Sequence, residues 1–113
     1  AIRDLAQTGC FVEYDRFGCE DTNFAYEVGE VATYPVSDVQ RMESLEYLVS
    51  EGFGDRIVIA HDVCTKMDTT AYGGKGYPHI LENIVPRMRK RGFTEKQVHA
   101  ILVDNPARAL AFS

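Results

Sequence analysis

The chain of 113 residues lacks the features that would assign it at once to a membrane or nucleic-acid class. It has no apolar run near the roughly 20 residues that a membrane-spanning helix needs, and we find no signal peptide. It has no basic stripe, and its net charge is −5. Neither a membrane nor a nucleic acid is therefore expected as a partner, and the length suits one small domain.

Cysteine is also scarce. The three residues Cys10, Cys19 and Cys64 form no C-x-x-C pair, and their number is odd. This usage is typical of free thiols in a reducing compartment, so the sequence predicts a cytoplasmic protein. Cys10 opens a strand-like run and is expected to be a small core residue.

The most informative stretch that is present reads "IVIAHD", residues 57–62. Four apolar residues without alternation are typical of a strand covered on both faces, as in a parallel sheet. We expect this strand to cover 57–61 and to place Asp62 at its carboxyl end, where α/β folds gather ligands. Because side chains alternate along a strand, His61 should face the other way and have a structural hydrogen-bonding role.

The remaining pattern alternates strands and helices. Two capping boxes, at Ser37 with Gln40 and at Thr94 with Gln97, mark helix starts. The expected order is a helix end before Gly9, a strand at 10–15, a loop at 16–37, a helix at 38–51, the strand at 57–61, a loop at 62–77, a helix at 78–91 kinked at Pro86, a short helix from 94 to 103, and a last short helix from Pro106. This order predicts a parallel α/β sheet.

A sheet of two parallel strands is not stable alone, so each strand needs further neighbours. The chain therefore either pairs with copies of itself or is a piece of a larger barrel. The opening "AIRDLAQTG" resembles the last two turns of a helix whose beginning is missing, which favours a piece.

Several motifs in this order resemble one family. "IVIAHDVCTK", followed by "YGGKGYPHILENIVPRMRKRGFTEKQVHAILVDNPARAL", is similar to the end of the phosphotriesterase-like family in the amidohydrolase superfamily. "GCFVEYDRFGCE" looks like the preceding strand and loop, and its "DRFG" resembles the lactonase and phosphotriesterase-related branches. True phosphotriesterases have histidine where this chain has Arg16.

The resemblance implies a (β/α)8 barrel of TIM type, with residues 10–15 as the seventh strand and 57–61 as the eighth. Residues 1–113 would then be a single partial domain, the C-terminal part of the barrel. In the family, the aspartate that closes the eighth strand binds a divalent metal and takes the proton of its water. That position is Asp62, and the metal implied is zinc in a binuclear centre. Alternatively, Asp62 only caps backbone donors of its loop.

The family's other ligands, a His-x-His pair, a bridging lysine or carboxylate and two further histidines, come from earlier strands that this chain does not contain. A catalytic zinc usually has at least three protein ligands. We therefore expect the isolated chain to be catalytically inactive.

Other candidates lie near the expected mouth of the barrel. Arg16 could polarise a substrate carbonyl or pair with Asp62, and Asp15 could orient Arg16; alternatively, Asp15 and Arg16 form a structural network without substrate contact. Aromatic side chains could line a pocket or simply pack: Phe17, Phe24, Tyr26 and Tyr34. His79 and His99 are expected on helices, as surface or packing residues. "GGKG" at 73–76 lacks P-loop spacing and predicts a turn-rich lid.

Two functions follow from these observations. The first is part of a metal-dependent hydrolase that cleaves a small ester, lactone, phosphotriester or amide with the rest of the barrel. The second is a non-catalytic binding or assembly module, derived from such a barrel, that pairs through its strand edges with a copy of itself or another chain.

Overall fold

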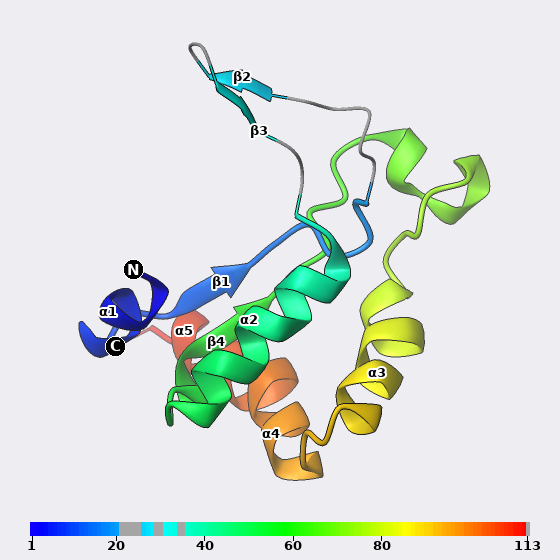
Figure 1. Cartoon of the computed structure of the whole chain (residues 1–113). Helices are drawn as coiled ribbons and strands as arrows, with labels where there is room; N and C mark the ends of the chain where they lie inside the picture. Colours follow the sequence, from blue (N-terminus) through cyan, green and yellow to red (C-terminus); the bar gives the residue numbers. More distant parts are fainter. Residues whose placement is uncertain (21–25, 29–30, 34–35, 113) are drawn as a thin grey trace.

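Two short parallel strands form the centre of the computed structural model, which describes residues 1–20, 26–28, 31–33 and 36–112 (Figure 1). Strand β1 covers Val12–Tyr14 and β4 covers Ile57–Ile59. They pair in parallel with Val12 opposite Ile57. The ladder continues past β4, because Ala60 N–H donates to the Tyr14 carbonyl at 3.0 Å. The predicted parallel pair is confirmed.

Both strands end sooner than predicted. β4 stops at Ile59, so His61 and Asp62 lie beyond the regular ladder. The backbone at Asp62 is left-handed, with φ 52°, and Arg16 beyond β1 has φ 61°. The alternation of side chains that we assumed for His61 and Asp62 therefore does not apply, and their directions depend on this local backbone.

Helices before and between the strands match their sequence signals. α1 covers Ile2–Gln7 and ends at Thr8, followed by Gly9 with φ 87°. α2 covers Asp38–Ser50, and its capping box of Ser37 and Gln40 is formed on both sides. Left-handed backbone after a helix favours glycine, which explains why α1 ends just before Gly9.

The buried face of α2 differs from the predicted stripe. Met42, Leu45 and Leu48 are buried as expected, whereas Val39 is 50% exposed. In its place Asp38 and Arg41 are buried. Asp38 and Arg41 can be buried here because the interior offers them hydrogen-bond partners. The apolar periodicity of the sequence gives no sign of these partners.

The C-terminal part contains α3 at Val85–Lys90, α4 at Glu95–His99 and α5 at Asn105–Leu110. The Thr94 capping box before α4 is formed. π-helical segments, Ile80–Ile84 and Ala100–Asp104, precede α3 and α5. Proline has no N–H to donate four residues back and crowds the carbonyl there, so the helix widens before Pro86 and Pro106. A local π segment thus stands where we predicted a kink at Pro86.

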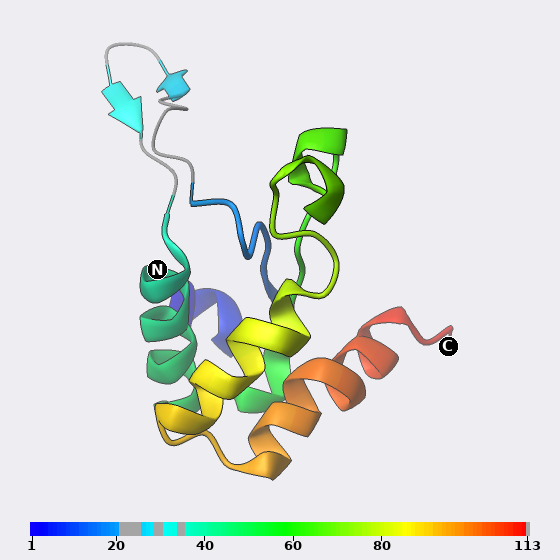
Figure 2. The same cartoon turned by 90° about the vertical axis from the view of Figure 1, so that its right-hand side faces the viewer.

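The two predicted loops differ in content. Within 16–37, the strands β2 (Tyr26–Val28) and β3 (Val31–Thr33) form an antiparallel hairpin that the sequence analysis missed. Figure 2 shows this hairpin standing away from the helices. The segment 62–77 contains only short 3-10 turns, at Lys66–Asp68 and Thr70–Tyr72, and is otherwise irregular as predicted.

The core forms between β4 and the helices. Ile57 is fully buried, as are the predicted helix positions Ile84 and Met88. Val58, Ile59 and Ala60 are only half-buried. The described residues therefore do not cover both faces of β4, although the sequence predicted a strand that is covered on both faces. Within the described part of the chain, no helix has the length and apolarity to cross a membrane.

All three cysteines are free, as predicted. Cys10 is exposed, however, and its Sγ donates to the Leu5 carbonyl at 3.1 Å. The expectation of a core residue was wrong because β1 begins only at Val12.

Candidate active site at the carboxyl ends of the strands

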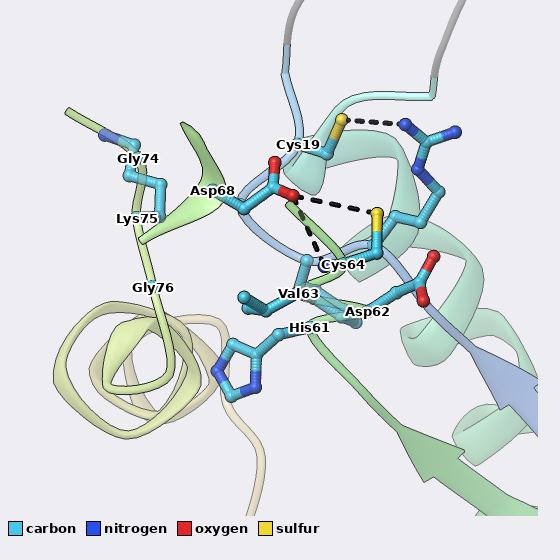
Figure 3. Close-up of a pocket in the computed structure, with 12 residues that line it drawn as sticks. Cys19, His61, Asp62, Val63, Cys64, Asp68, Gly74, Lys75 and Gly76 are labelled. Carbon is cyan, nitrogen blue, oxygen red and sulfur yellow. Dashed lines mark hydrogen bonds between the residues drawn. The ribbon is translucent and has the colours of Figure 1, made fainter. Parts of the chain in front are cut away.

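A pocket of about 260 Å³ lies where β1 and β4 end (Figure 3). Its walls are the loop after β1 and the long segment after β4. The lining residues are Arg16, Phe17, Gly18, Cys19, His61, Asp62, Val63, Cys64, Asp68, Gly74, Lys75 and Gly76. The pocket therefore brings together Arg16, Phe17 and Asp62 from the predicted set.

Asp62 is exposed, and its left-handed backbone turns its side chain away from that of His61 (Figure 3). His61 Nε2 accepts the Ile80 N–H at 3.0 Å. Burial lowers the pKa of His61, and the nearby His79 lowers it further. A neutral imidazole suits an accepting Nε2, so the predicted structural hydrogen-bonding role of His61 is confirmed.

Arg16 is held in a tight turn after β1. Its carbonyl accepts the Cys19 N–H at 3.0 Å, and its Nη2 lies 3.1 Å from Cys19 Sγ. The intervening Phe17 is 2% exposed, with the Arg41 guanidinium 5.8 Å from its ring centre. Phe17 thus belongs to the core as well as to the pocket wall.

Among the described candidates, Asp15 and His99 do not line this pocket. Asp15 is exposed and does not belong to the residues that line it. Phe24 and Tyr34 lie outside the described residues, as does the side chain of Tyr26. His99 is exposed, and its Nδ1 lies 3.1 Å from Asp104 Oδ2.

Asp68 organises the segment after β4. Its Oδ2 accepts the Thr65 N–H at 2.8 Å, the Thr65 hydroxyl at 2.9 Å and the Cys64 N–H at 3.3 Å. These hydrogen bonds, those from Thr65 first, lower the pKa of Asp68. A Cβ on Gly74 would lie 2.2 Å from the Asp68 carbonyl oxygen. Gly74 of "GGKG" therefore allows a close backbone approach, and the segment is turn-rich as predicted, with short 3-10 turns; its role as a lid stays a prediction.

Asp38 and His79 form a buried pair behind the pocket that the sequence analysis missed. Asp38 is 1% exposed and His79 is 2% exposed, and Oδ2 lies 2.7 Å from Nε2. His79 is thus a packing residue, within the range of roles we predicted. Asp38 follows an N-cap serine, where an acidic residue is expected from the helix dipole alone. Its partner is 41 positions away, so no local signal marks the pair.

For the metal that the resemblance implies, the pocket contains one candidate ligand, Asp62. Among the described residues, no group of three His, Cys, Asp or Glu side chains could hold a metal ion. Asp62 offers a single exposed carboxylate, whereas a catalytic zinc needs about three protein ligands. The described residues therefore do not form a metal centre by themselves.

The family model of the phosphotriesterase family matches residues 1–110. The chain belongs to the phosphotriesterase family. It is 53% identical over 111 residues to an N-acetyltaurine hydrolase of Salmo salar, covering 98% of this chain and 31% of that protein. It is 45% identical over 109 residues to an N-acetyltaurine hydrolase of Dictyostelium discoideum, covering 96% and 29%. The chain thus spans about a third of the curated relatives it matches.

Solved structures of this family agree with the fold. A resiniferatoxin-binding protein from Rhodobacter sphaeroides superposes with a TM-score of 0.83 at 35% identity, over 96% of this chain and 29% of that one. A lactonase from Listeria monocytogenes superposes with a TM-score of 0.76 at 33% identity, over 99% and 32%. The chain is therefore an α/β portion of a phosphotriesterase-like fold.

Proposed function

We propose that this chain supplies the seventh and eighth βα units of a (β/α)8 hydrolase barrel and one side of its active site. One observation carries the proposal: Arg16 follows β1, Asp62 follows β4, and both line one pocket at the carboxyl ends of these strands. In barrels of this type the catalytic residues lie at that face of the sheet. The open edges of β1 and β4 would pair with the strands that complete the barrel.

The substrate class we propose is an N-acyl amide such as N-acetyltaurine. The relatives that carry the name N-acetyltaurine hydrolase are 45% to 53% identical to this chain. The lactonase structure is 33% identical. A lactone or a phosphotriester is therefore the less favoured substrate.

The chain's residues have separate roles in this proposal. Hydrolysis adds water to the acyl carbon, breaks the C–N bond, and moves a proton to the leaving amine. Asp62 would hold and pass that proton, and the Arg16 guanidinium would stabilise the negative charge that develops on the carbonyl oxygen. Phe17 would close the pocket wall between them.

The family resemblance also implies a divalent metal, which in such enzymes polarises a bound water. Asp62 is the one residue of this chain that we propose as a ligand. The remaining ligands would come from parts of the barrel outside these residues, so the isolated chain should not hydrolyse substrate.

The test compares the complete natural protein with the isolated 113-residue chain. Both are titrated with zinc and assayed for release of acetate from N-acetyltaurine, with a lactone and a phosphotriester as alternative substrates. We expect turnover of the amide by the complete protein only. Turnover by the isolated chain would sink the proposal that the site is shared, and preference for the lactone would overturn the substrate class.

A second candidate is a non-catalytic assembly module. The half-buried residues Val58, Ile59 and Ala60 favour it, because a second copy could cover them. The mass of the natural protein and the presence of an upstream His-x-His strand distinguish the two. A natural protein of this length without that strand would support the module.

A further inference from the structure

One buried carboxylate contacts the loop after β1 and the residue His79, which follows the segment after β4. Asp38 accepts the Gly18 N–H with Oδ1 at 3.0 Å and Oδ2 at 3.2 Å, and its Oδ2 lies 2.7 Å from His79 Nε2. Gly18 belongs to the loop after β1, and His79 follows the long segment after β4. A single side chain of α2 thus links the loop after β1 to the residue that follows the long segment after β4, and the hydrolysis proposed above leaves it without a role.

The two loops also touch at Gly18. A Cβ at this position would lie 2.8 Å from Lys75 Cβ and 3.0 Å from His79 Cδ2. Because Gly18 has φ 95°, a larger residue would be strained there as well as crowded. The turn that carries Arg16 is therefore pressed against the opposite wall, with Asp38 holding it from behind.

Through His79, Asp38 is also connected to His61, the residue before Asp62. The N–H of Ile80, the next residue after His79, donates to His61 Nε2 at 3.0 Å. Asp38 is therefore connected on one side to the turn of Arg16 and on the other to the neighbour of Asp62. Both proposed catalytic residues depend on loops that meet at this carboxylate.

The chemistry around Asp38 requires a carboxylate. Arg41 Nη1 donates to Oδ1 at 3.2 Å, in addition to the Gly18 N–H. The Asn83 amide nitrogen lies 3.2 Å from His79 Nδ1, so Nδ1 accepts and Nε2–H donates to Asp38. Within the described residues, the groups that contact the Asp38 carboxylate are donors, namely Gly18 N–H, Arg41 Nη1 and His79 Nε2. An asparagine amide in its place would direct its own NH2 donor toward one of them.

We propose that Asp38 is a positioning residue for the active site. Its carboxylate holds the loop of Arg16 and the segment that fixes His61 in one arrangement. This inference rests on the proposed hydrolase function, and its first test is independent of activity.

The first test is hydrogen exchange in the complete natural protein with Asp38→Asn. We expect exchange of the Cys19 and Ile80 amides to accelerate about tenfold, because loss of charged hydrogen bonds lets both loops open locally. Neither amide is bonded to Asp38. The Phe53 amide, which donates to the Leu48 carbonyl at the opposite end of α2, should be unchanged.

The matched control is Asn105→Ala, which removes a buried polar side chain at the amino end of β4. It should leave the Cys19 and Ile80 amides unchanged. Equal acceleration in both variants, or none in Asp38→Asn, would overturn the proposal. If Asp38→Asn does not fold, His79→Gln replaces it, with the same two amides expected to accelerate and unchanged exchange again contradicting us.

The second test is kinetic. With N-acetyltaurine, Asp38→Asn should lower kcat/KM about a hundredfold, mostly through kcat, since misplaced catalytic groups lose orientation. Asn105→Ala should keep kcat at temperatures where it is folded. A loss confined to stability would contradict a positioning role. A wild-type protein without activity would reject the hydrolase proposal, and the exchange result alone would then decide whether Asp38 holds the loops.

Discussion

The two ends of strand β4 use buried polar side chains in different ways. At the amino end, Asn105 is fully buried, and its Nδ2 donates to the carbonyls of Gly54 at 2.8 Å and Ile57 at 2.7 Å. Arg108 Nη2 donates to Asn105 Oδ1 at 2.8 Å. At the carboxyl end, Asp38 joins two loops that are far apart in sequence. The first arrangement holds the turn before β4 against α5, whereas the second positions segments that border a pocket.

Backbone conformation differs in the same way. Among the described residues, Arg16 and Asp62 are the non-glycine positions with positive φ, and both lie at the carboxyl end. Helix ends near the amino side use glycine for this conformation, at Gly52 and Gly92. Such strain in non-glycine residues is concentrated at functional sites because the surroundings must hold it. The comparison indicates an end that serves stability and an end that places side chains.

The largest expected effect is a loss of activity in a variant of Asp62 but not of Asp55, the two aspartates on either side of β4. Asp62→Asn in the complete protein should lower kcat/KM for N-acetyltaurine about a thousandfold, as for loss of a proton-transfer group. Asparagine tolerates the left-handed backbone, so the fold should persist. The control is Asp55→Asn at the amino end, which should remain active in the same acetate-release assay. Comparable losses in the two variants would erase the distinction between the ends.

The next effect concerns stability at the amino end. Asn105→Ala leaves the buried Ile57 carbonyl and the partly buried Gly54 carbonyl without their donor and should lower the free energy of unfolding by about 2–3 kcal/mol. Urea denaturation of the complete protein measures this change. Glu82→Ala, an exposed substitution on the π segment before α3, serves as the control and should change it little. A cost for Asn105→Ala no larger than that of the control would show that Asn105 does not hold this end.

The two helix caps provide a smaller comparison. Ser37→Ala and Thr94→Ala each remove a side-chain acceptor at a helix start and should each cost about 1 kcal/mol. Ser37 precedes Asp38, so its loss should also lower kcat, whereas Thr94→Ala should not. Thermal unfolding and steady-state kinetics measure the two effects. Reduced kcat in Thr94→Ala would contradict the separation.

The smallest effect is a pH dependence on the outer surface. The hydrogen bond from Arg91 lowers the pKa of Glu46 below its ordinary value. A depressed carboxyl pKa stabilises the fold above the unfolded pKa of about 4.5, and this contribution is lost as pH falls through the folded pKa. Glu46→Gln should therefore flatten the fall in melting temperature between about pH 5 and pH 3. Glu82→Gln is the control, and identical acid profiles for wild type and Glu46→Gln would disprove the assignment.

The sequence predicted much of the local structure. The apolar run at 57–60 predicted β4, the two capping boxes predicted the starts of α2 and α4, and Gly9 predicted the end of α1. These signals depend on residues within one turn or one strand of each other. The hairpin β2–β3 escaped prediction because its strands are only three residues each and no local period marks them.

The candidate site was predicted in part. Arg16, Phe17 and Asp62 could be chosen because each follows a strand, and strand ends of a parallel pair meet at one edge. Asp38 could not be chosen, since a polar residue at a helix start is ordinary on a solvent-facing turn. Only its burial against Gly18 and His79 distinguishes it.

The sequence by itself determined the two parallel strands, the helices α1, α2 and α4, their order and the residues that follow the strands, because helix caps, apolar runs and glycine stops act over a few residues. The tertiary structure alone decided which of those residues meet. Segments 20 to 50 positions apart are brought together by packing and hydrogen bonds that no local pattern encodes, as between Asp38 and Gly18, Asp38 and His79, or Asn105 and Ile57.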